Sequence, residues 1–227
     1  IPQYMRDGVV DLAILGENLV VEKGGDLSII EKLGFSKCRV CIAVPKRISF
    51  SGLEDLEGKQ IATSHPNTVK SFLSKNKINA GLHMINGSVE IAPNIGLADA
   101  ICDIVSSGST LFKNNLKEVI QIATSEAVLV QAPNLNKVKI ELIEKLCFRI
   151  KSVLRAKKSK YILMNVPNDK IAPISAILPV LKSLTVMPLA EEGWSSVHSV
   201  IDKDTFWDVI DQLKQANATR ISIAESG

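Results

Sequence analysis

Residues 98–111 read Ala98-Asp99-Ala100-Ile101-Cys102-Asp103-Ile104-Val105-Ser106-Ser107-Gly108-Ser109-Thr110-Leu111. The apolar run within this stretch predicts a buried strand, and the small hydroxyl residues after it predict a loop. Gly108 permits positive φ and close approach of the backbone to a ligand. The amides and hydroxyls of such a loop, together with the amides of a following short helix, suit an anion such as a phosphate. A simple Ser/Gly turn after a buried strand explains the spacing equally well.

Hydrogen-bond acceptors beside such a loop would suit a sugar phosphate, because the ring hydroxyls need partners. Asp99 and Asp103 supply carboxylates within the stretch, and Glu90 lies upstream in residues 89–97, which we expect to be helical. For Glu90, a surface glutamate without function is the alternative. The residues expected to hold the anion are Ser106, Ser107, Gly108, Ser109 and Thr110.

Residues 96–111 resemble the phosphoribosyl-pyrophosphate loop of the ATP phosphoribosyltransferase family. Further matches are Gly87-Ser88-Val89-Glu90-Ile91-Ala92-Pro93, Asp11-Leu12-Ala13-Ile14 with Gly16, Leu33-Gly34-Phe35-Ser36-Lys37-Cys38, and Met187-Pro188-Leu189-Ala190 with Glu192-Gly193-Trp194. The resemblance extends from Ile1 nearly to Gly227. Several motifs in the family's order make it more specific than any one motif alone.

The resemblance implies an activity. A member of this family transfers the phosphoribosyl group of phosphoribosyl pyrophosphate to N1 of ATP, giving phosphoribosyl-ATP and pyrophosphate, the first step of histidine biosynthesis, with histidine as feedback inhibitor. Mg²⁺ would arrive with the pyrophosphate rather than in a dedicated protein site. Ser107 to Thr110 would hold the 5′-phosphate. Asp103, with Asp99 as a second candidate, would meet the ribose hydroxyls, and Glu90 would meet the ribose or the metal.

The motifs of other enzyme classes are missing, which is consistent with this chemistry. The sequence contains no G-x-x-x-x-G-K-[ST] and no H-E-x-x-H, and its three histidines are scattered. We expect His65, His83 and His198 to be structural. Phosphoribosyl transfer needs no covalent protein intermediate, because it depends mainly on positioning and electrostatics.

Bulk composition bounds the partners. A net charge of +3 and 4% aromatic residues disfavour a nucleic-acid binder. No apolar run reaches the length of a membrane span, and no signal peptide is recognisable. The four cysteines lie mostly in apolar patterns and predict core thiols in a reducing cytoplasm rather than a disulfide framework.

The pattern predicts an α/β fold. We expect one lobe from residues 1–45 and 125–157, and a second lobe from 46–124, with a strand at 126–132 crossing back to the first. The resemblance implies a two-lobed architecture like that of type II periplasmic binding proteins, with a cleft between the lobes. Gly16 ends the strand 9–15, where α/β proteins present ligands, so Gly16 is a substrate-binding candidate. Asp11, in the motif Asp11-Leu12-Ala13-Ile14 that resembles the family, is the second substrate-binding candidate. Asn18 either faces that ligand or only caps a helix, and Glu17 is a further candidate. Residues 137–157 predict a long helix with one apolar stripe.

Residues 158–227 predict the order βαββαβ of a ferredoxin-like domain. The resemblance implies that this is a regulatory domain that binds histidine. Residues 182–188 resemble a Ser-Pro-Thr-containing segment of the family, with Leu184 where proline is usual. Thr185 and, more weakly, Asn165 are the effector-binding candidates, and positions at the edge of the core are the alternative.

The resemblance also bears on the N-terminal part of the family and on its assembly. The family begins with a strand and a basic loop that have no match before Ile1, and a molecule lacking them is expected to show weak or no catalysis with the phosphate loop still formed. The family assembles as dimers and hexamers, so a homo-oligomer is expected. The alternative function is a non-catalytic two-lobed small-molecule-binding or regulatory protein, which the full set of loop motifs disfavours.

Overall fold

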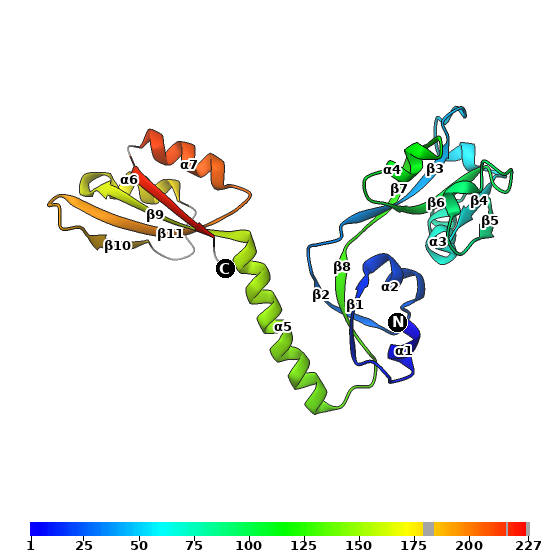
Figure 1. Ribbon diagram of the computed structural model, residues 1–227, viewed down its shortest axis with the longest axis horizontal. Coiled ribbons are helices and arrows are strands. Elements are labelled where there is room, and N and C mark those ends of the chain that lie inside the picture. The colour runs from blue at the N-terminus through cyan, green and yellow to red at the C-terminus, as the bar shows by residue number, and fades with distance from the viewer. Residues whose placement is uncertain (179–183, 217, 226–227) are drawn as a thin grey trace. The chain divides into compact units, whose positions relative to one another are not determined.

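In the computed structural model the described residues are 1–178, 184–216 and 218–225 (Figure 1). The chain forms two compact units, Ile1–Ile140 and Glu141–Gly227. The unit boundary lies inside the long helix rather than at residue 157, where the sequence places the end of the first lobe. No helix in the described ranges combines the length and apolar character needed to cross a bilayer.

The N-terminal unit contains a small antiparallel sheet. Its strands are β1 (Leu12–Gly16), β8 (Ala127–Gln131) and β2 (Ser28–Lys32), in the order β1-β8-β2. Helices α1 (Pro2–Arg6) and α2 (Glu17–Lys23) accompany it, and Met5, Leu15 and Val20 pack with Val128 and Val130 in its core. Strand β2 was not expected, because its five residues are exposed or half-buried and show no clear alternation.

The second sheet has the order β5-β4-β6-β3-β7. Its strands are β5 (Gly81–Met84), β4 (Gln60–Thr63), β6 (Ala100–Val105), β3 (Cys38–Pro45) and β7 (Leu116–Ser125). Strand β4 runs parallel to β5 and β6, whereas β3 runs antiparallel to β6 and β7. Assigning residues up to 45 to the first lobe is therefore wrong for β3, since both edges of β3 pair within the second sheet.

Helices flank this second sheet. They are the 3-10 turn η1 (Leu53–Leu56), α3 (Pro66–Asn76), the 3-10 turn η2 (Val89–Ile91) and α4 (Ser109–Lys113). The helix expected over 89–97 is only the single turn η2. Pro93 cannot donate an amide hydrogen bond, and Gly96 adopts φ +73°, so the helical pattern cannot continue.

Strands β7 and β8 follow each other with only Glu126 between them, so one path connects the two sheets (Figure 1). This confirms the crossing strand expected over 126–132. The segment from β2 to β3 makes a second connection. Two crossings between two sheets are the arrangement expected for a two-lobed α/β region.

Helix α5 (Lys137–Lys158) has the predicted extent, but its apolar stripe is not a buried one. Ile143 is the buried residue of the helix, whereas Val138 and Leu142 are more than 60% exposed. Its first turn belongs to the N-terminal unit through Lys139, which forms an ion pair with Asp11.

The C-terminal unit confirms the predicted ferredoxin-like order. After α5 come β9 (Ser159–Pro167), η3 (Asn168–Lys170), α6 (Ile171–Ile177), β10 (Thr185–Pro188), β11 (Trp194–Asp202), α7 (Phe206–Gln215) and β12 (Thr219–Glu225). The sheet order is β10-β11-β9-β12, with every pair antiparallel. Ile162, Met164 and Ile174 are fully buried with Phe206 and Leu213. Residues 182 and 183, the first two of the segment that resembles the family's Ser-Pro-Thr-containing segment, lie outside the described residues.

Candidate functional site

The hydroxyl loop lies at the carboxyl end of β6 and lines a cavity of about 310 Å³. Gly108 adopts φ +79°, as its place in the sequence predicts, and α4 begins at the next residue. The hydroxyl of Ser107 donates to Ser109 Oγ at 3.1 Å. The residues that line the cavity are Glu90, Asp103, Ile104, Val105, Ser106, Ser107, Gly108, Ser109, Thr110 and Leu111. The fold therefore brings both candidate catalytic carboxylates to the loop.

Asp103 is half-buried in this cavity, and its pKa is raised above the ordinary aspartate value. Burial is the main cause, because it removes water from the charged form, and the negative charge of Glu90 adds to it. The amide of Ile104 donates to Asp103 Oδ1 at 2.8 Å. This hydrogen bond and the interaction with His65 both lower the pKa of Asp103, but less than burial raises it. The carboxylate is thus incompletely solvated, which prepares it to accept hydrogen bonds from a ligand.

A second cavity of about 500 Å³ adjoins the first, because Ile104 lines both. It lies against α2 and the start of α3. Its lining residues are Gly16, Asn18, Leu19, Glu22, Lys23, Ser64, His65, Asn86, Gly87 and Ile104. Of the candidates from the first lobe, Gly16 and Asn18 are placed here.

Asn18 is not a helix cap, since α2 has no side-chain cap bond. Its Oδ1 accepts from Ser125 Oγ at 2.9 Å, and its Nδ2 lies 3.1 Å from His65 Nε2. An amide nitrogen only donates, so His65 Nε2 must accept, and Nδ1 then carries the proton toward Ser64 Oγ, 3.0 Å away. Asn18 thereby joins the first lobe to the wall of the second cavity.

Glu22 makes a second contact between α2 and α3, and it was not foreseen. Its carboxylate is buried and accepts from the amides of Asn67 and Thr68 at 3.0 and 2.9 Å, and from Thr68 Oγ1 at 2.8 Å. These are the first free amides of α3, whose own N-cap residue, His65, supplies no side-chain bond. Glu22 therefore takes the place of a capping side chain. A lone glutamate in a helical pattern gives no signal of this.

Three candidates line neither of these two cavities. Asp99 lies at the opposite end of β6, where its Oδ2 accepts from the Gln60 amide at 2.9 Å and it lines a separate cavity of about 490 Å³. Asp11 precedes β1, at the other end of the strand from Gly16, and pairs with Lys139 Nζ at 2.8 Å. Glu17 pairs with Lys32 at 2.8 Å and does not line the second cavity.

The effector candidates share one face of the C-terminal sheet. Thr185 pairs with His198, and Asn165 pairs with Ser196, so the two candidates are on β10 and β9 with β11 between them. Residues paired across antiparallel strands lie on the same face, and two strand spacings amount to about 10 Å. His198, which was expected to be structural, contacts Ser196 Oγ through Nε2 at 3.0 Å and also bonds the Tyr161 hydroxyl.

No group of three or more His, Cys, Asp or Glu side chains in the described ranges is arranged to hold a metal ion. Glu90 and Asp103 are the acidic pair that lines the loop cavity. Two carboxylates suit an ion that keeps most of its ligands from water and substrate phosphates.

Comparisons with known proteins show the family of the chain. The family model for ATP phosphoribosyltransferase matches residues 1–152, and the model described as HisG, C-terminal domain, matches residues 156–225. ATP phosphoribosyltransferases of Cytophaga hutchinsonii and Bacteroides thetaiotaomicron are each 52% identical, over 98% of this chain and 78% and 79% of those proteins.

Solved structures show the same fold. The ATP phosphoribosyl transferase (HisG:HisZ) complex from Thermotoga maritima matches with a TM-score of 0.60 and 28% identity, covering 68% of this chain and 75% of that one. The substrate binding protein of an amino acid ABC transporter matches with a TM-score of 0.50 and 19% identity, covering 67% and 70%, and shows the fold alone. By its two family models and its relatives, the chain belongs to the ATP phosphoribosyltransferase family.

Proposed function

We propose that this chain transfers the phosphoribosyl group of phosphoribosyl pyrophosphate to N1 of ATP, the first step of histidine biosynthesis. The observation that carries the proposal is the loop cavity, where Asp103 and Glu90 face the same space as the hydroxyl residues 106–110. Membership of the family supports the reaction, and the lining of the cavity supports the residue roles proposed below.

In this proposal the loop amides and hydroxyls from Ser107 to Thr110 hold the 5′-phosphate. Asp103 accepts hydrogen bonds from the ribose hydroxyls. N1 of ATP, held in the adjoining cavity beside Gly16, attacks C1 of the ribose while the C1–oxygen bond breaks and pyrophosphate leaves with the electron pair. The carboxylates of Asp103 and Glu90 stabilise the positive charge that develops on the ribose, and the cavity walls orient the two substrates.

A divalent cation, proposed to be Mg²⁺, would neutralise charge on the departing pyrophosphate. Glu90 is the residue proposed to meet it, because Glu90 lines the same cavity as Asp103. Asp99 and Asp11 are left out of this proposal, since neither lines the loop cavity or its neighbour.

For regulation, we propose that histidine binds at the sheet face shared by Thr185 and Asn165. Ser196 and His198 lie between them on β11, and their polar atoms suit the amino and carboxylate groups of an amino acid.

Ligand-induced stabilisation tests both sites at once. Both tryptophans, Trp194 and Trp207, lie in the C-terminal unit, so tryptophan fluorescence reports on that unit while circular dichroism reports on the whole chain. A ligand at about 100 times its Kd adds roughly 2.7 kcal/mol to the stability of the folded state. We expect histidine to raise the fluorescence midpoint and magnesium phosphoribosyl pyrophosphate to raise the circular-dichroism midpoint.

Two variants serve as controls for each other. Asp103→Asn should lose the phosphoribosyl-pyrophosphate effect and keep the histidine effect, and Thr185→Ala should do the reverse. Formation of phosphoribosyl-ATP by the wild type, followed by mass spectrometry, would establish the reaction. Binding without turnover would favour the alternative of a non-catalytic binding protein, and no response to phosphoribosyl pyrophosphate would contradict the proposed cavity.

A further inference from the structure

Arg39 is a charged residue that the proposed mechanism does not use, yet it contacts the hydroxyl loop, residues 106–110, through the backbone of Ser106. It lies near the start of β3, paired with Val105 at the end of β6, one residue before the loop begins. Its Nη1 donates to the backbone carbonyl of Ser106 at 3.0 Å. Arg39 does not line the loop cavity, so it touches the loop from outside the proposed phosphate site.

Glu118 on β7 holds the guanidinium in place. Arg39 Nε lies 2.8 and 3.0 Å from the two Glu118 oxygens, and Nη2 lies 2.7 Å from Oε2. This forked geometry fixes the plane of the guanidinium, which a single contact would not do. The remaining nitrogen, Nη1, is thereby aimed at the loop.

The surroundings keep this pair charged. The hydrogen bond from Arg39 lowers the pKa of Glu118, and the same bond raises the pKa of Arg39. The thiol of Cys41 donates from Sγ to Glu118 Oε1 at 3.0 Å. Burial is the main cause that raises the pKa of Cys41 to about 12, and the hydrogen bond to Glu118 is the next. The thiol therefore stays protonated and acts as a further donor to Glu118.

A bond to the Ser106 carbonyl sets the direction of the next amide. In a planar trans peptide, the C=O of Ser106 and the N–H of Ser107 point in opposite directions. With the carbonyl held toward Arg39, the Ser107 amide is directed to the other side of the loop, where the cavity lies.

We propose that Arg39 is a positioning residue for phosphoribosyl pyrophosphate, acting through the Ser106 carbonyl rather than by contact with the substrate. This inference rests on the proposed function of the loop. A surface ion pair ordinarily contributes little to folding stability. In this inference the Arg39–Glu118 pair instead contributes to ligand affinity.

Substitutions of the two partners separate this role from a charge effect. If Arg39 acts through the loop, Arg39→Met and Glu118→Gln both weaken binding, because each removes the fork that aims Nη1. If Arg39 attracts the phosphate by its charge, Glu118→Gln instead strengthens binding, since it removes a nearby negative charge. Arg39→Lys keeps the charge but not the fork, so positioning predicts a defect close to that of Arg39→Met.

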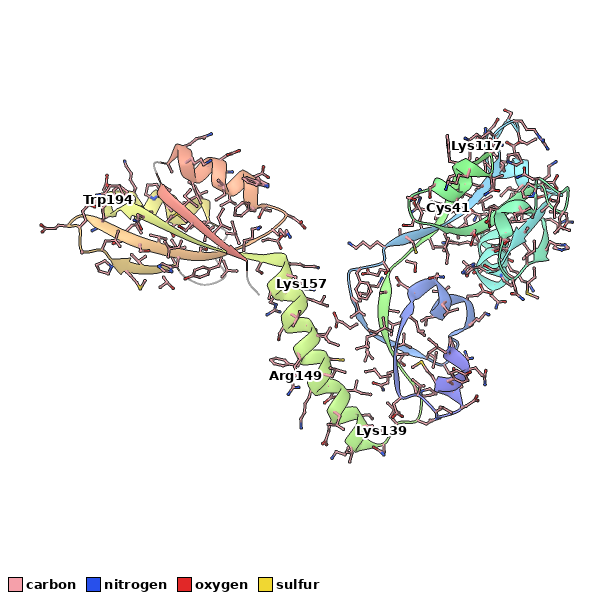
Figure 2. All side chains as sticks on the ribbon, viewed as in Figure 1. Cys41, Lys117, Lys139, Arg149, Lys157 and Trp194 are labelled. Atoms are coloured by element: carbon pink, nitrogen blue, oxygen red, sulfur yellow. The ribbon has the colours of Figure 1, made fainter. Side chains whose placement is uncertain are left out.

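The measurement is the Kd of magnesium phosphoribosyl pyrophosphate by titration calorimetry, with ATP as the second ligand. We expect Arg39→Met to raise the Kd about tenfold, as for the loss of one charge-assisted hydrogen bond, with Kd for ATP unchanged within about twofold. Lys117→Met is the matched control, since it removes one positive charge from the same sheet, where Figure 2 shows Lys117 and Cys41. This control should leave the Kd unchanged.

The outcomes are distinguishable. Wild-type protein that does not bind phosphoribosyl pyrophosphate would overturn the proposed function and this inference with it. Wild-type binding with an unchanged Kd in Arg39→Met, full rescue by Arg39→Lys, or tighter binding by Glu118→Gln would overturn the inference alone. If Arg39→Met does not fold, by circular dichroism, Glu118→Gln and Arg39→Lys decide the question.

Discussion

Replacing Glu22 by alanine should destabilise the N-terminal unit more than any ordinary surface substitution. Glu22 lies on α2, is only 4% exposed, and its carboxylate accepts three hydrogen bonds from the first turn of α3. Alanine would leave the amides of Asn67 and Thr68 without an acceptor, at a helix end where negative charge is favourable.

The size of the effect follows from these contacts. A hydrogen bond to a charged group contributes about 1.5–3 kcal/mol, and loss of a helix cap costs about 1 kcal/mol. The three bonds share one carboxylate and do not add fully, so we expect Glu22→Ala to cost about 3 kcal/mol. For a unit of this size, that corresponds to a fall in Tm of about 10 °C. Glu22→Gln keeps one acceptor oxygen and should cost about half as much.

Circular dichroism during thermal unfolding is the assay, with tryptophan fluorescence as an internal reference for the C-terminal unit. Glu17→Ala is the matched control, because Glu17 lies on the same helix and only pairs with Lys32 at 2.8 Å. Such an ion pair is worth about 0–1 kcal/mol. The reasoning would be refuted by a Glu22→Ala protein whose Tm lies within about 2 °C of that of Glu17→Ala.

Two further predictions concern the loop cavity. With Mg²⁺ present to offset the repulsion between Asp103 and the phosphates, Asp103→Asn should lower phosphoribosyl-pyrophosphate affinity about 10-fold to 100-fold, as expected for the loss of charge-assisted hydrogen bonds to the ribose hydroxyls. Because the folded-state pKa of Asp103 is raised, the folded protein binds more protons than the unfolded chain between the ordinary and the raised pKa, and stability falls as pH rises through that interval. Asp103→Asn should remove this fall in stability, and thermal unfolding measured from about pH 3 to about pH 7 tests it. A variant whose Tm depends on pH as that of the wild type does would contradict the argument that burial raises the pKa of Asp103. Gly108→Ala places a side chain in open space at φ +79°, so only backbone strain of about 1–2 kcal/mol opposes it. We expect Gly108→Ala to lower phosphoribosyl-pyrophosphate affinity at least about fivefold and to change Tm by only a few degrees. If calorimetry gave the wild-type affinity, the loop would not need the left-handed conformation of Gly108.

The local motif predicted the loop well because its signals are short-range. A buried strand, a glycine that must take positive φ and a run of hydroxyls all lie within a dozen residues, and the structure places Gly108 in the left-handed region at the expected point. The ferredoxin-like unit was equally readable, since its strands and helices alternate with clear apolar faces.

Asp99 shows why proximity in sequence misleads. Asp99 and Asp103 would lie on adjacent turns of a helix, about 5–6 Å apart. On a strand the same four-residue spacing covers about 13 Å, which puts Asp99 at the far end of β6. The expectation treated both as neighbours of the loop, although the stretch was itself predicted to be a strand.

The contacts that hold the site in place could not be predicted from the sequence, because they join residues far apart along the chain. Arg39 and Glu118 are 79 positions apart, and Asn18 and Ser125 are 107 apart. Each residue is ordinary by itself, and only the strand order β6-β3-β7 and the crossing of the chain between two sheets bring the partners together. The assignment of β3 to the first lobe failed for the same reason, because its pairing partners lie far along the chain.

The charges around the loop cavity set a condition on binding. Among its lining residues, all of which are described, none is cationic and two are carboxylates, and the charge of Arg39 behind the loop is balanced by Glu118. At about 5 Å and an effective dielectric constant of about 20, one carboxylate disfavours a phosphate charge by about 3 kcal/mol. Amides and hydroxyls offset part of this, and a divalent cation bound with the substrate must offset the rest. We therefore expect the affinity of this chain for phosphoribosyl pyrophosphate to fall about a hundredfold when Mg²⁺ is replaced by a chelator, and Glu90→Gln to reduce that dependence. Titration calorimetry with and without Mg²⁺ measures both, with histidine binding as the control. Equal affinity in the two conditions would mean that the cavity accommodates the polyanion without a cation, and the electrostatic roles given to Glu90 and Asp103 would have to be abandoned.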